Sequence, residues 1–201
     1  MLNMDALLVI DIQNDFLPGG SLAVPQGDDV IPVVNALMPE FAVVVATQDW
    51  HPANHLSFAS QHSDKQVGDV IELAGLPQIL WPDHCVHGTR GAELATPLNR
   101  SLIQHVIQKG TDRTIDSYSG FFDNARRKAT GLEAYLRSKG IDRVHLVGLA
   151  TDYCVKATAL DAIDLGFHTV LRSAGIRGVE LHAGDCERAI EEMRAVGVII
   201  Q

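Results

Sequence analysis

The chain has 201 residues, of which 46% are hydrophobic and 20% are charged, and this composition is ordinary for one globular domain. Its formal net charge of −9 argues against nucleic acid as a partner, because an acidic surface repels phosphate backbones. No apolar run approaches the roughly 20 residues needed to cross a bilayer. The first residues also lack the basic segment of a signal peptide. We therefore expect a cytoplasmic protein without a membrane segment.

Alternating apolar and helical segments predict the order of strands and helices along the chain. Apolar runs typical of buried parallel strands occur at 6–10, 41–46, 105–107, 144–149, 168–171 and 198–200. Helical patterns lie between them, at 28–38, 130–140, 154–166 and 185–197. This alternation predicts an α/β fold in a single domain over residues 1–201, with a parallel sheet flanked by helices on both faces.

Capping residues predict where the helices begin and end. Asp28 is expected to cap the first helix, and Thr130 with Glu133 forms the pattern of a capping box at the second. Glycine, which favours the left-handed residue that ends a helix, follows three of the helices at positions 140, 166 and 197.

The stretch 48–101 breaks this alternation. It has no strong strand signal, but it holds both tryptophans of the chain and several histidines. Long irregular connections in compact domains are usually functional or disordered, and the aromatic content here favours an ordered loop. We expect this region to form a pocket and to bind a metal.

Ionisable side chains follow several of the predicted strands. Asp11 follows the first strand, Lys109 ends the third, and Cys154 follows the fourth after a short turn. Because the carboxyl ends of parallel strands meet at one edge of a sheet, these groups are expected to converge. Cys154, at a helix N-terminus whose dipole favours a thiolate, is the candidate nucleophile. Asp11 is the candidate proton acceptor, and Lys109 the cation that holds both anions.

A different interpretation treats Cys154 as a small buried hydrophobe and Asp11 as a turn cap, because free cysteine is often buried. The positions of Asp11 and Lys109 at strand ends favour the catalytic interpretation. Cys85 and Cys186 are expected to be structural. Three cysteines are a small and odd number, which does not suit a disulfide framework, so all three thiols are expected to be reduced.

A second group of side chains has the composition of a metal site. Asp49, His51 and His55 follow the second strand, and His84 lies further along the same region. A carboxylate with several imidazoles suits a divalent transition metal such as zinc, iron or manganese. A helical turn would place His51 and His55, four residues apart, on one side. The alternative is a set of loop histidines in contact with water.

Five stretches of the chain carry a resemblance to a known family. They are VIDIQNDF at 9–16, QDWHPANH at 48–55, WPDHCV at 81–86, DSYSGF at 116–121 and GLATDYCV at 148–155. In this order they resemble the nicotinamidase/pyrazinamidase branch of the isochorismatase-like cysteine hydrolases. The resemblance spans nearly the whole chain.

The resemblance implies a six-stranded parallel sheet and assigns a role to each group of residues. It implies a catalytic triad of Asp11, Lys109 and Cys154, and a divalent metal among Asp49, His51, His55 and His84 that can bind the pyridine nitrogen of a substrate. It further implies a cis peptide between Leu149 and Ala150, with the amides of Ala150 and Cys154 facing the oxyanion. Phe16, Trp81 and Tyr118, with Ala150, would enclose the substrate ring.

The implied activity is hydrolysis of the small molecule nicotinamide to nicotinate and ammonia through a thioester on Cys154, within NAD salvage. Pyrazinamide is a second expected substrate. Alternatives are a metal-independent cysteine amidase for ureido or carbamoyl substrates, a metallohydrolase in which a metal-bound hydroxide attacks, and a non-catalytic metal-binding or redox protein. The sequence leaves open whether the chain forms a homo-oligomer.

Overall fold

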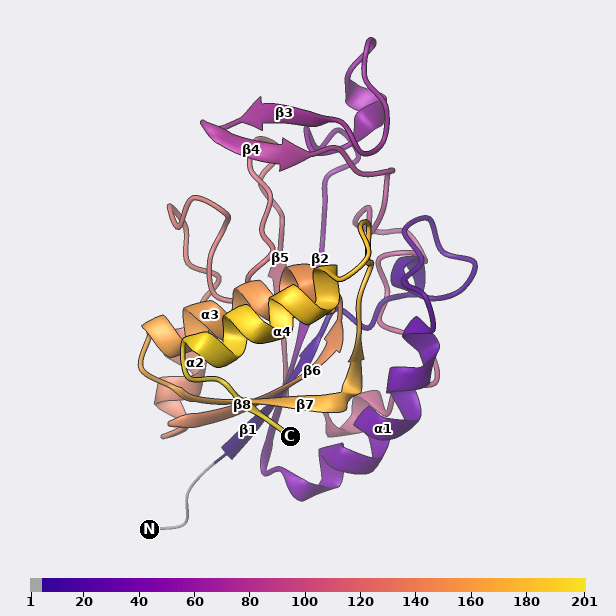
Figure 1. Ribbon diagram of the computed structural model, residues 1–201. Helices are drawn as coiled ribbons and strands as arrows, with labels where there is room; N and C mark the ends of the chain where they lie inside the picture. The colour runs from indigo at the N-terminus through magenta and orange to yellow at the C-terminus, as the bar shows by residue number, and fades with distance from the viewer. Residues whose placement is uncertain (1–4) are drawn as a thin grey trace.

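The computed structural model describes residues 5–201 and contains a six-stranded parallel sheet (Figure 1). The strands are β1 (Asp5–Ile10), β2 (Val43–Asp49), β5 (His105–Lys109), β6 (Arg143–Leu149), β7 (His168–Arg177) and β8 (Ile199–Ile200). They lie in the order β5-β2-β1-β6-β7-β8, with each neighbouring pair parallel. The predicted α/β fold with six parallel strands is confirmed, although β2, β5 and β7 extend beyond their apolar runs.

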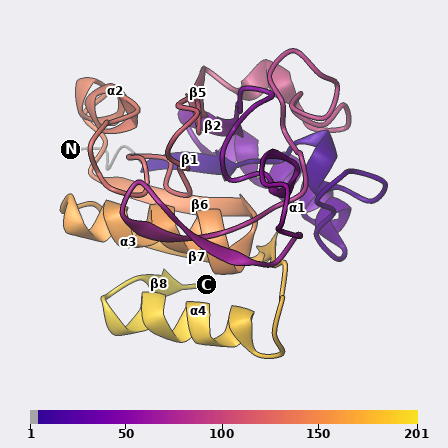
Figure 2. The same ribbon diagram turned by 90° about the horizontal axis from the view of Figure 1, so that it is seen from above.

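Helices cover both faces of the sheet, as the sequence predicts. They are α1 (Val30–Leu37), α2 (Leu132–Ser138), α3 (Lys156–Asp164) and α4 (Asp185–Ala195). Residues of α1 pack in one apolar core, residues of α2, α3 and α4 pack in the other, and α3 and α4 run side by side (Figure 2). No helix within residues 5–201 is long and apolar enough to cross a membrane.

Strand β1 runs through the centre of the sheet and contributes to both cores. Ala6, Leu8 and Ile10 face the core that contains α2, α3 and α4. Leu7 and Val9 face the core beneath α1. Side chains alternate across a strand, so a strand covered on both faces must be apolar throughout, and all five residues are fully buried.

Two helix starts differ from the sequence prediction. A 3-10 turn at Gly27–Asp29 precedes α1, whose first turn has no side-chain cap, so Asp28 is not its cap. At α2 the Thr130 hydroxyl accepts a hydrogen bond from the Leu132 N–H, but the Thr130 N–H donates to Phe121 O rather than to Glu133. The reciprocal hydrogen bond of the capping box, from the Thr130 N–H to Glu133, is therefore absent, because the Thr130 N–H bonds to Phe121 instead.

The region 48–101 contains a small hairpin that the sequence pattern did not indicate. Strands β3 (Val70–Leu73) and β4 (Leu76–Ile79) pair antiparallel and lie above the carboxyl ends of β2 and β5 in Figure 1. Each strand has four residues, β4 contains a proline, and β3 is half exposed, so neither gives the continuous apolar run of a sheet strand. Gln48 and Asp49, the first residues of the region, belong to β2.

The strand order reverses at β1, which pairs with β2 on one side and with β6 on the other. Ligands in open α/β sheets bind beyond the carboxyl ends of the strands at such a switch point. Asp11 leaves the sheet there after β1, Cys154 follows the neighbouring strand β6, and Lys109 ends β5, which lies one strand further away beyond β2. The topology therefore directs the predicted catalytic side chains to one place.

We predict that Gly148→Ala destabilises the fold more than Gly131→Ala does. Both glycines have a left-handed φ, +116° and +97°, so each alanine introduces strain of about 1–3 kcal/mol. At Gly148 the new Cβ would also lie 2.0 Å from Ile10 O on the neighbouring strand, whereas at Gly131 it would meet nothing within 4 Å. The overpacking adds about 1–3 kcal/mol. Urea denaturation measures the free energy of unfolding of both variants. An equal decrease in the two variants would contradict the predicted backbone clash.

Candidate active site and metal centre

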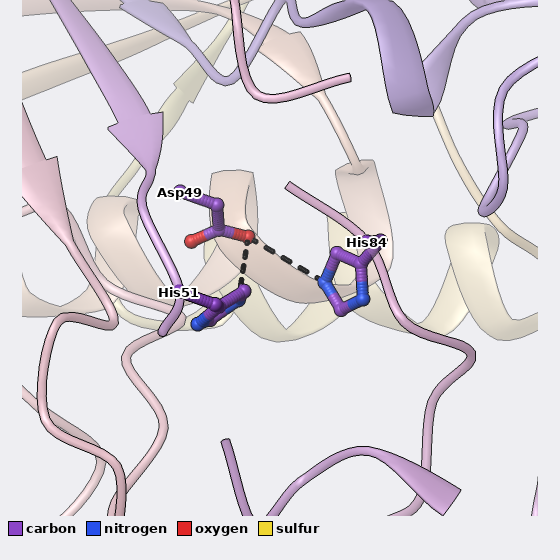
Figure 3. A group of neighbouring side chains, drawn as sticks. All are labelled: Asp49, His51 and His84. Carbon is purple, nitrogen blue, oxygen red and sulfur yellow. Dashed lines mark ion pairs between the residues drawn. The ribbon is translucent and has the colours of Figure 1, made fainter. Parts of the chain in front are cut away.

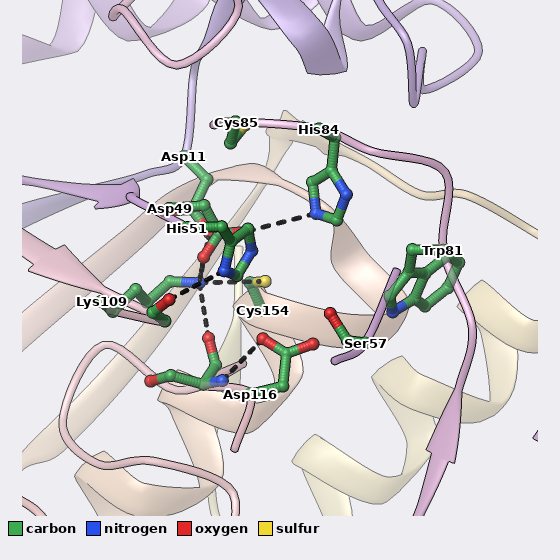
Figure 4. A network of polar contacts seen from close by, with 12 residues as sticks. Asp11, Asp49, His51, Ser57, Trp81, His84, Cys85, Lys109, Asp116 and Cys154 are labelled. Carbon is green, nitrogen blue, oxygen red and sulfur yellow. Dashed lines mark hydrogen bonds and ion pairs between the residues drawn. The ribbon is translucent and has the colours of Figure 1, made fainter. Parts of the chain in front are cut away.

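Lys109 lies at the centre of the candidate site, at the end of β5 (Figure 4). Its Nζ lies 2.9 Å from Asp11 Oδ2, 2.5 Å from Asp49 Oδ1 and 3.4 Å from Cys154 Sγ. It also donates a hydrogen bond of 2.8 Å to the carbonyl oxygen of Ser117. The structure thus brings the three predicted catalytic residues together and adds two acceptors, one of which is the predicted metal ligand Asp49.

The two carboxylates that contact Lys109 differ in protonation behaviour. Burial raises the pKa of Asp11 above its usual value, although the nearby Lys109 ammonium opposes this. Burial also acts against the charged form of Asp49, but Lys109 and then His51 hold the pKa of Asp49 well below its usual range. Asp49 is therefore a permanent anion, whereas Asp11 is suited to accept and return a proton.

Lys109 itself stays charged in this buried position. Burial disfavours its ammonium, but the carboxylates of Asp11 and Asp49 outweigh that effect and raise the pKa of Lys109 well above its usual value. The cation, rather than a general base, is the form of Lys109 that the site holds.

Cys154 lies in a π-helical turn, Thr151–Val155, between β6 and α3. Burial raises the pKa of its thiol well above the usual value, although Lys109 opposes this. The sequence argument that the helix dipole favours a thiolate is therefore outweighed by burial, and the neutral thiol is the resting form. A carboxylate oxygen of Asp11 lies within 4.8 Å of Cys154 Sγ, close enough for a short movement to transfer the proton.

The backbone around Ala150 has the form that the resemblance implied. The peptide between Leu149 and Ala150 is cis. The following turn closes on the carbonyl of Ala150, which accepts hydrogen bonds from Tyr153 N at 3.1 Å and Val155 N at 3.0 Å. Amides of a first helical turn have no acceptor within the helix, and Ala150 and Cys154 both line the pocket.

Asp49, His51 and His84 converge as one group of ligand atoms (Figure 3). Asp49 Oδ2 lies 3.7 Å from His51 Nε2 and 3.9 Å from His84 Nε2. The Nδ1 atoms contact the carbonyl oxygens of Gly110 and Pro82, each at 2.8 Å, so each ring is held with Nε2 facing Asp49.

One observation shows that these residues fit a metal ion. His51 Nε2 is buried and has no hydrogen-bond partner among the described residues. Buried polar atoms without partners are rare in folded proteins. A divalent transition metal held by two imidazole nitrogens and a carboxylate would satisfy this atom and the facing lone pairs.

His55 lies beside His51 but does not join Asp49 and His84. Its ring is 4.6 Å from the His51 ring, while its Nδ1 contacts Ser57 Oγ at 2.7 Å. Its Nε2 lies 3.3 Å from Ile115 O. Residues 51–55 form a tight turn and not the predicted helical turn, and His55 is not in the group formed by Asp49, His51 and His84. His55 instead groups with His51 and Asp116.

Gln13 supports Asp49 through the backbone, a role that sequence reasoning missed. Its buried side-chain amide donates to Asp49 O at 2.8 Å and accepts from Asp49 N at 2.8 Å. Strand β1 has ended by this point, so the amide replaces the strand as the partner of β2. The sequence shows only a glutamine two residues after Asp11, and its burial became visible in the structure.

A small pocket opens beside Cys154 and contains the predicted aromatic residues. It is lined by Phe16, Leu22, Asp49, Trp81, His84, Asp116, Tyr118, Ala150, Tyr153, Cys154 and Val179. Trp81 Nε1 donates to the Tyr118 hydroxyl at 3.2 Å, and the Phe16 ring lies 5.6 Å from the His84 ring.

Sequence reasoning missed four of the residues that line this pocket. They are Leu22, Asp116, Tyr153 and Val179. Tyr153 packs edge-on against Trp81 at 5.0 Å, and its place next to Cys154 was a usable signal. Leu22 and Val179 come from distant segments and had none.

We predict that zinc affinity falls as the pH is lowered, because His51 takes up a proton. Burial opposes its charged form, but the Asp49 carboxylate outweighs burial and raises the pKa of His51 above its ordinary value. Burial lowers the pKa of His84 to about 4, so His84 stays neutral and ready to bind over the same range. Zinc must therefore displace one proton at any pH below the raised pKa of His51. Competition with a chelator between pH 5 and 8 measures this, and a constant affinity would contradict it.

We predict that Lys109→Met lowers the free energy of unfolding by about 3–5 kcal/mol, because it leaves two buried carboxylates without their cation. Lys156→Met is the matched control, since Lys156 makes a 3.0 Å ion pair with Glu192 on the surface. Loss of this surface ion pair should lower the free energy of unfolding by no more than about 1 kcal/mol. Chemical denaturation at pH 7 compares the two, and similar effects would show that the buried cation contributes no special stability.

The chain is similar to known proteins over nearly its whole length. Residues 5–201 match the isochorismatase domain. A curated nicotinamidase from Escherichia coli is 48% identical over 97% of this chain and 93% of its own length. A solved nicotinamidase/pyrazinamidase from Acinetobacter baumanii superposes with a TM-score of 0.95 at 46% identity, covering 98% of this chain and 95% of that one. A pyrazinamidase from Pyrococcus horikoshii in complex with zinc gives 0.80 at 40% identity, covering 98% of each.

The chain therefore belongs to the isochorismatase-like hydrolases, in the group that includes these nicotinamidases and pyrazinamidases. The family resemblance drawn from the five sequence stretches is confirmed.

Proposed function

We propose that this protein is a nicotinamidase, an amidohydrolase that converts nicotinamide to nicotinate and ammonia. The observation that carries the proposal is the contact of Lys109 with Asp11, Asp49 and Cys154, because it joins a nucleophile and its base to a metal-ligand group. The pocket beside them is lined by aromatic side chains and suits a flat ring. Relatives named nicotinamidase match nearly the whole chain.

The first half of the mechanism forms a thioester. The substrate ring lies among Phe16, Trp81 and Tyr118 with its carboxamide toward Cys154. Asp11 accepts the thiol proton as the sulfur attacks the amide carbon, and Lys109 stabilises the anions on both sides. The carbonyl oxygen gains a negative charge, and in this proposal the backbone amides of Ala150 and Cys154, which line the pocket, donate hydrogen bonds to it.

The second half releases the products. Asp11 gives its proton to the departing nitrogen, so that ammonia leaves and a thioester to Cys154 remains. Asp11, again a carboxylate, takes a proton from a water molecule that attacks the thioester carbon. Collapse of this adduct returns the thiol and gives nicotinate. The raised pKa of Asp11 suits it to act as base and acid in turn.

Asp49, His51 and His84 are the residues that would hold a divalent metal such as zinc, iron or manganese. When bound, the metal supplies a Lewis acid that can bind the pyridine nitrogen and so orient the ring. The ligand set that we propose omits His55, whose two nitrogens already have partners. Pyrazinamide has a ring nitrogen in the same position, so we expect it to be a second substrate.

Two alternative activities remain for comparison within this fold. A cysteine amidase for ureido or carbamoyl substrates would share Asp11, Lys109 and Cys154, but it would not need two imidazoles that face one carboxylate. A metallohydrolase would use a metal-bound hydroxide and would not need a buried thiol beside Lys109. The metal-ligand group and the buried thiol lie at the same pocket, and this combination favours nicotinamidase activity. A nicotinamidase would act in NAD salvage.

We predict that purified protein releases ammonia from nicotinamide and that a strong chelator and a thiol alkylator each abolish the release. Cys154→Ala should show no detectable turnover while it keeps zinc affinity, because the thiol is not among the proposed ligands. Cys186→Ala is the matched control, since Cys186 is half-buried and is not among the residues that line the pocket.

Either of two results would change the proposal. Activity that survives in Cys154→Ala would replace the thioester route with a metal-bound hydroxide. No ammonia from nicotinamide with folded, metal-loaded protein would move the substrate to another amide, and ureido compounds would be tested next.

A further inference from the structure

Asp15 makes a contact that connects two distant parts of the site. Its Oδ2 accepts a hydrogen bond of 2.7 Å from the backbone N–H of Cys85, seventy residues away in sequence. That N–H belongs to the peptide bond between His84 and Cys85. Because a peptide unit is planar, a carboxylate that fixes this N–H also fixes the backbone from which the His84 side chain extends.

The peptide held by Asp15 is part of an unusual stretch of backbone. Cys85 has a φ of +45°, a left-handed conformation that is uncommon for residues other than glycine. Its carbonyl oxygen accepts a hydrogen bond of 3.0 Å from His51 N. Cys85 is thus held from both sides, by Asp15 through its N–H and by His51 through its carbonyl, and these two contacts fix where His84 lies relative to His51.

The surroundings of Asp15 are shaped to keep its carboxylate in place. Gly91 lies against it, and a Cβ at Gly91 would lie 2.0 Å from Asp15 Oδ2. The backbone of Asp15 donates to Gly91 O at 3.0 Å, so the two segments are joined directly. Asp15 is neither among the pocket-lining residues nor in the group with Asp49 and His84. Its carboxylate therefore serves the loop and not the substrate.

We propose that Asp15 is a positioning residue that holds His84 in the metal-binding geometry through the Cys85 N–H. The inference rests on the proposed function, because it concerns the metal that Asp49, His51 and His84 would hold. His84 Nδ1 is already fixed by Pro82 O, so the ring orientation is local, whereas the position of its backbone depends on Asp15. Loss of such outer contacts typically weakens metal affinity about 10- to 100-fold.

The test measures the zinc dissociation constant by competition with a chromophoric chelator. Asp15→Ala should weaken zinc binding about 10- to 100-fold, and Asp15→Asn, which keeps an oxygen acceptor, should restore most of it. Asn14→Ala is the matched control: Asn14 precedes Asp15, and its side chain donates to Arg90 O at 2.7 Å in an exposed contact. Its zinc affinity should equal that of the wild type.

A second variant tests the same contact without removing the carboxylate. Gly91→Ala places a methyl group where the end of the Asp15 side chain lies, so the carboxylate must move and release the Cys85 N–H. It should weaken zinc binding in the same way as Asp15→Ala. The rate at which iodoacetamide alkylates Cys154 in chelator-treated protein should not change in either variant, which separates misplacement of His84 from damage to the whole site.

Each outcome decides the inference. Folded Asp15→Ala with the zinc affinity of Asn14→Ala would overturn it, and if Asp15→Ala fails to fold, wild-type affinity in Gly91→Ala would do so. Slower or faster alkylation of Cys154 in step with the zinc loss would assign Asp15 a general structural role and also overturn it. If the wild-type protein binds no zinc but still hydrolyses nicotinamide, both the proposed metal centre and this inference are wrong. The proposed amidase activity would still hold.

Discussion

The ammonium of Lys109 lies buried between two carboxylates and a thiol, and the rest of the site depends on this contact. A buried cation is tolerated only when anions surround it, and each of its two carboxylates has a separate role. Asp11 faces the thiol of Cys154, and Asp49 faces two imidazoles. One charge therefore joins the nucleophile to the metal-ligand group, and neither group is complete without it.

The same cation leaves its two carboxylates with opposite protonation behaviour. Burial dominates at Asp11 and raises its pKa, whereas Lys109 together with the imidazoles dominates at Asp49 and lowers its pKa. Groups whose surroundings separate their pKa values in this way take different roles in a reaction. In the proposed mechanism, Asp11 moves a proton, and Asp49 remains an anion that would hold a metal.

The parallel sheet makes this convergence possible. Lys109, Asp11 and Cys154 come at the ends of β5, β1 and β6, which lie within four consecutive strands of the sheet but are far apart in sequence, and all three lie at its carboxyl edge. Helices seal both faces of the sheet, so this edge, covered by the β3–β4 hairpin and neighbouring loops, is where the pocket forms (Figure 1). The same sheet topology therefore requires apolar strands in the core and places the polar site at the carboxyl ends of those strands.

Much of this could be predicted from the sequence, because the signals are local. Buried parallel strands must be apolar on both faces, so runs such as Ala6–Ile10 reveal the sheet. Glycines at 140, 166 and 197 lie where three helices end. Reactive residues that follow strands indicated the site before any distance was known.

Other features were decided only by tertiary structure. Whether His55 faces Asp49 depends on a turn shape that spacing does not determine, and whether Cys154 is a thiol depends on how deeply it is buried. The contact of Asp15 with Cys85 joins segments seventy residues apart. Sequence by itself determined which elements form and which chemistry they carry, because those follow from neighbouring residues. Distances, burial and the pairing of charges needed the folded chain, because they arise between segments that meet only in space.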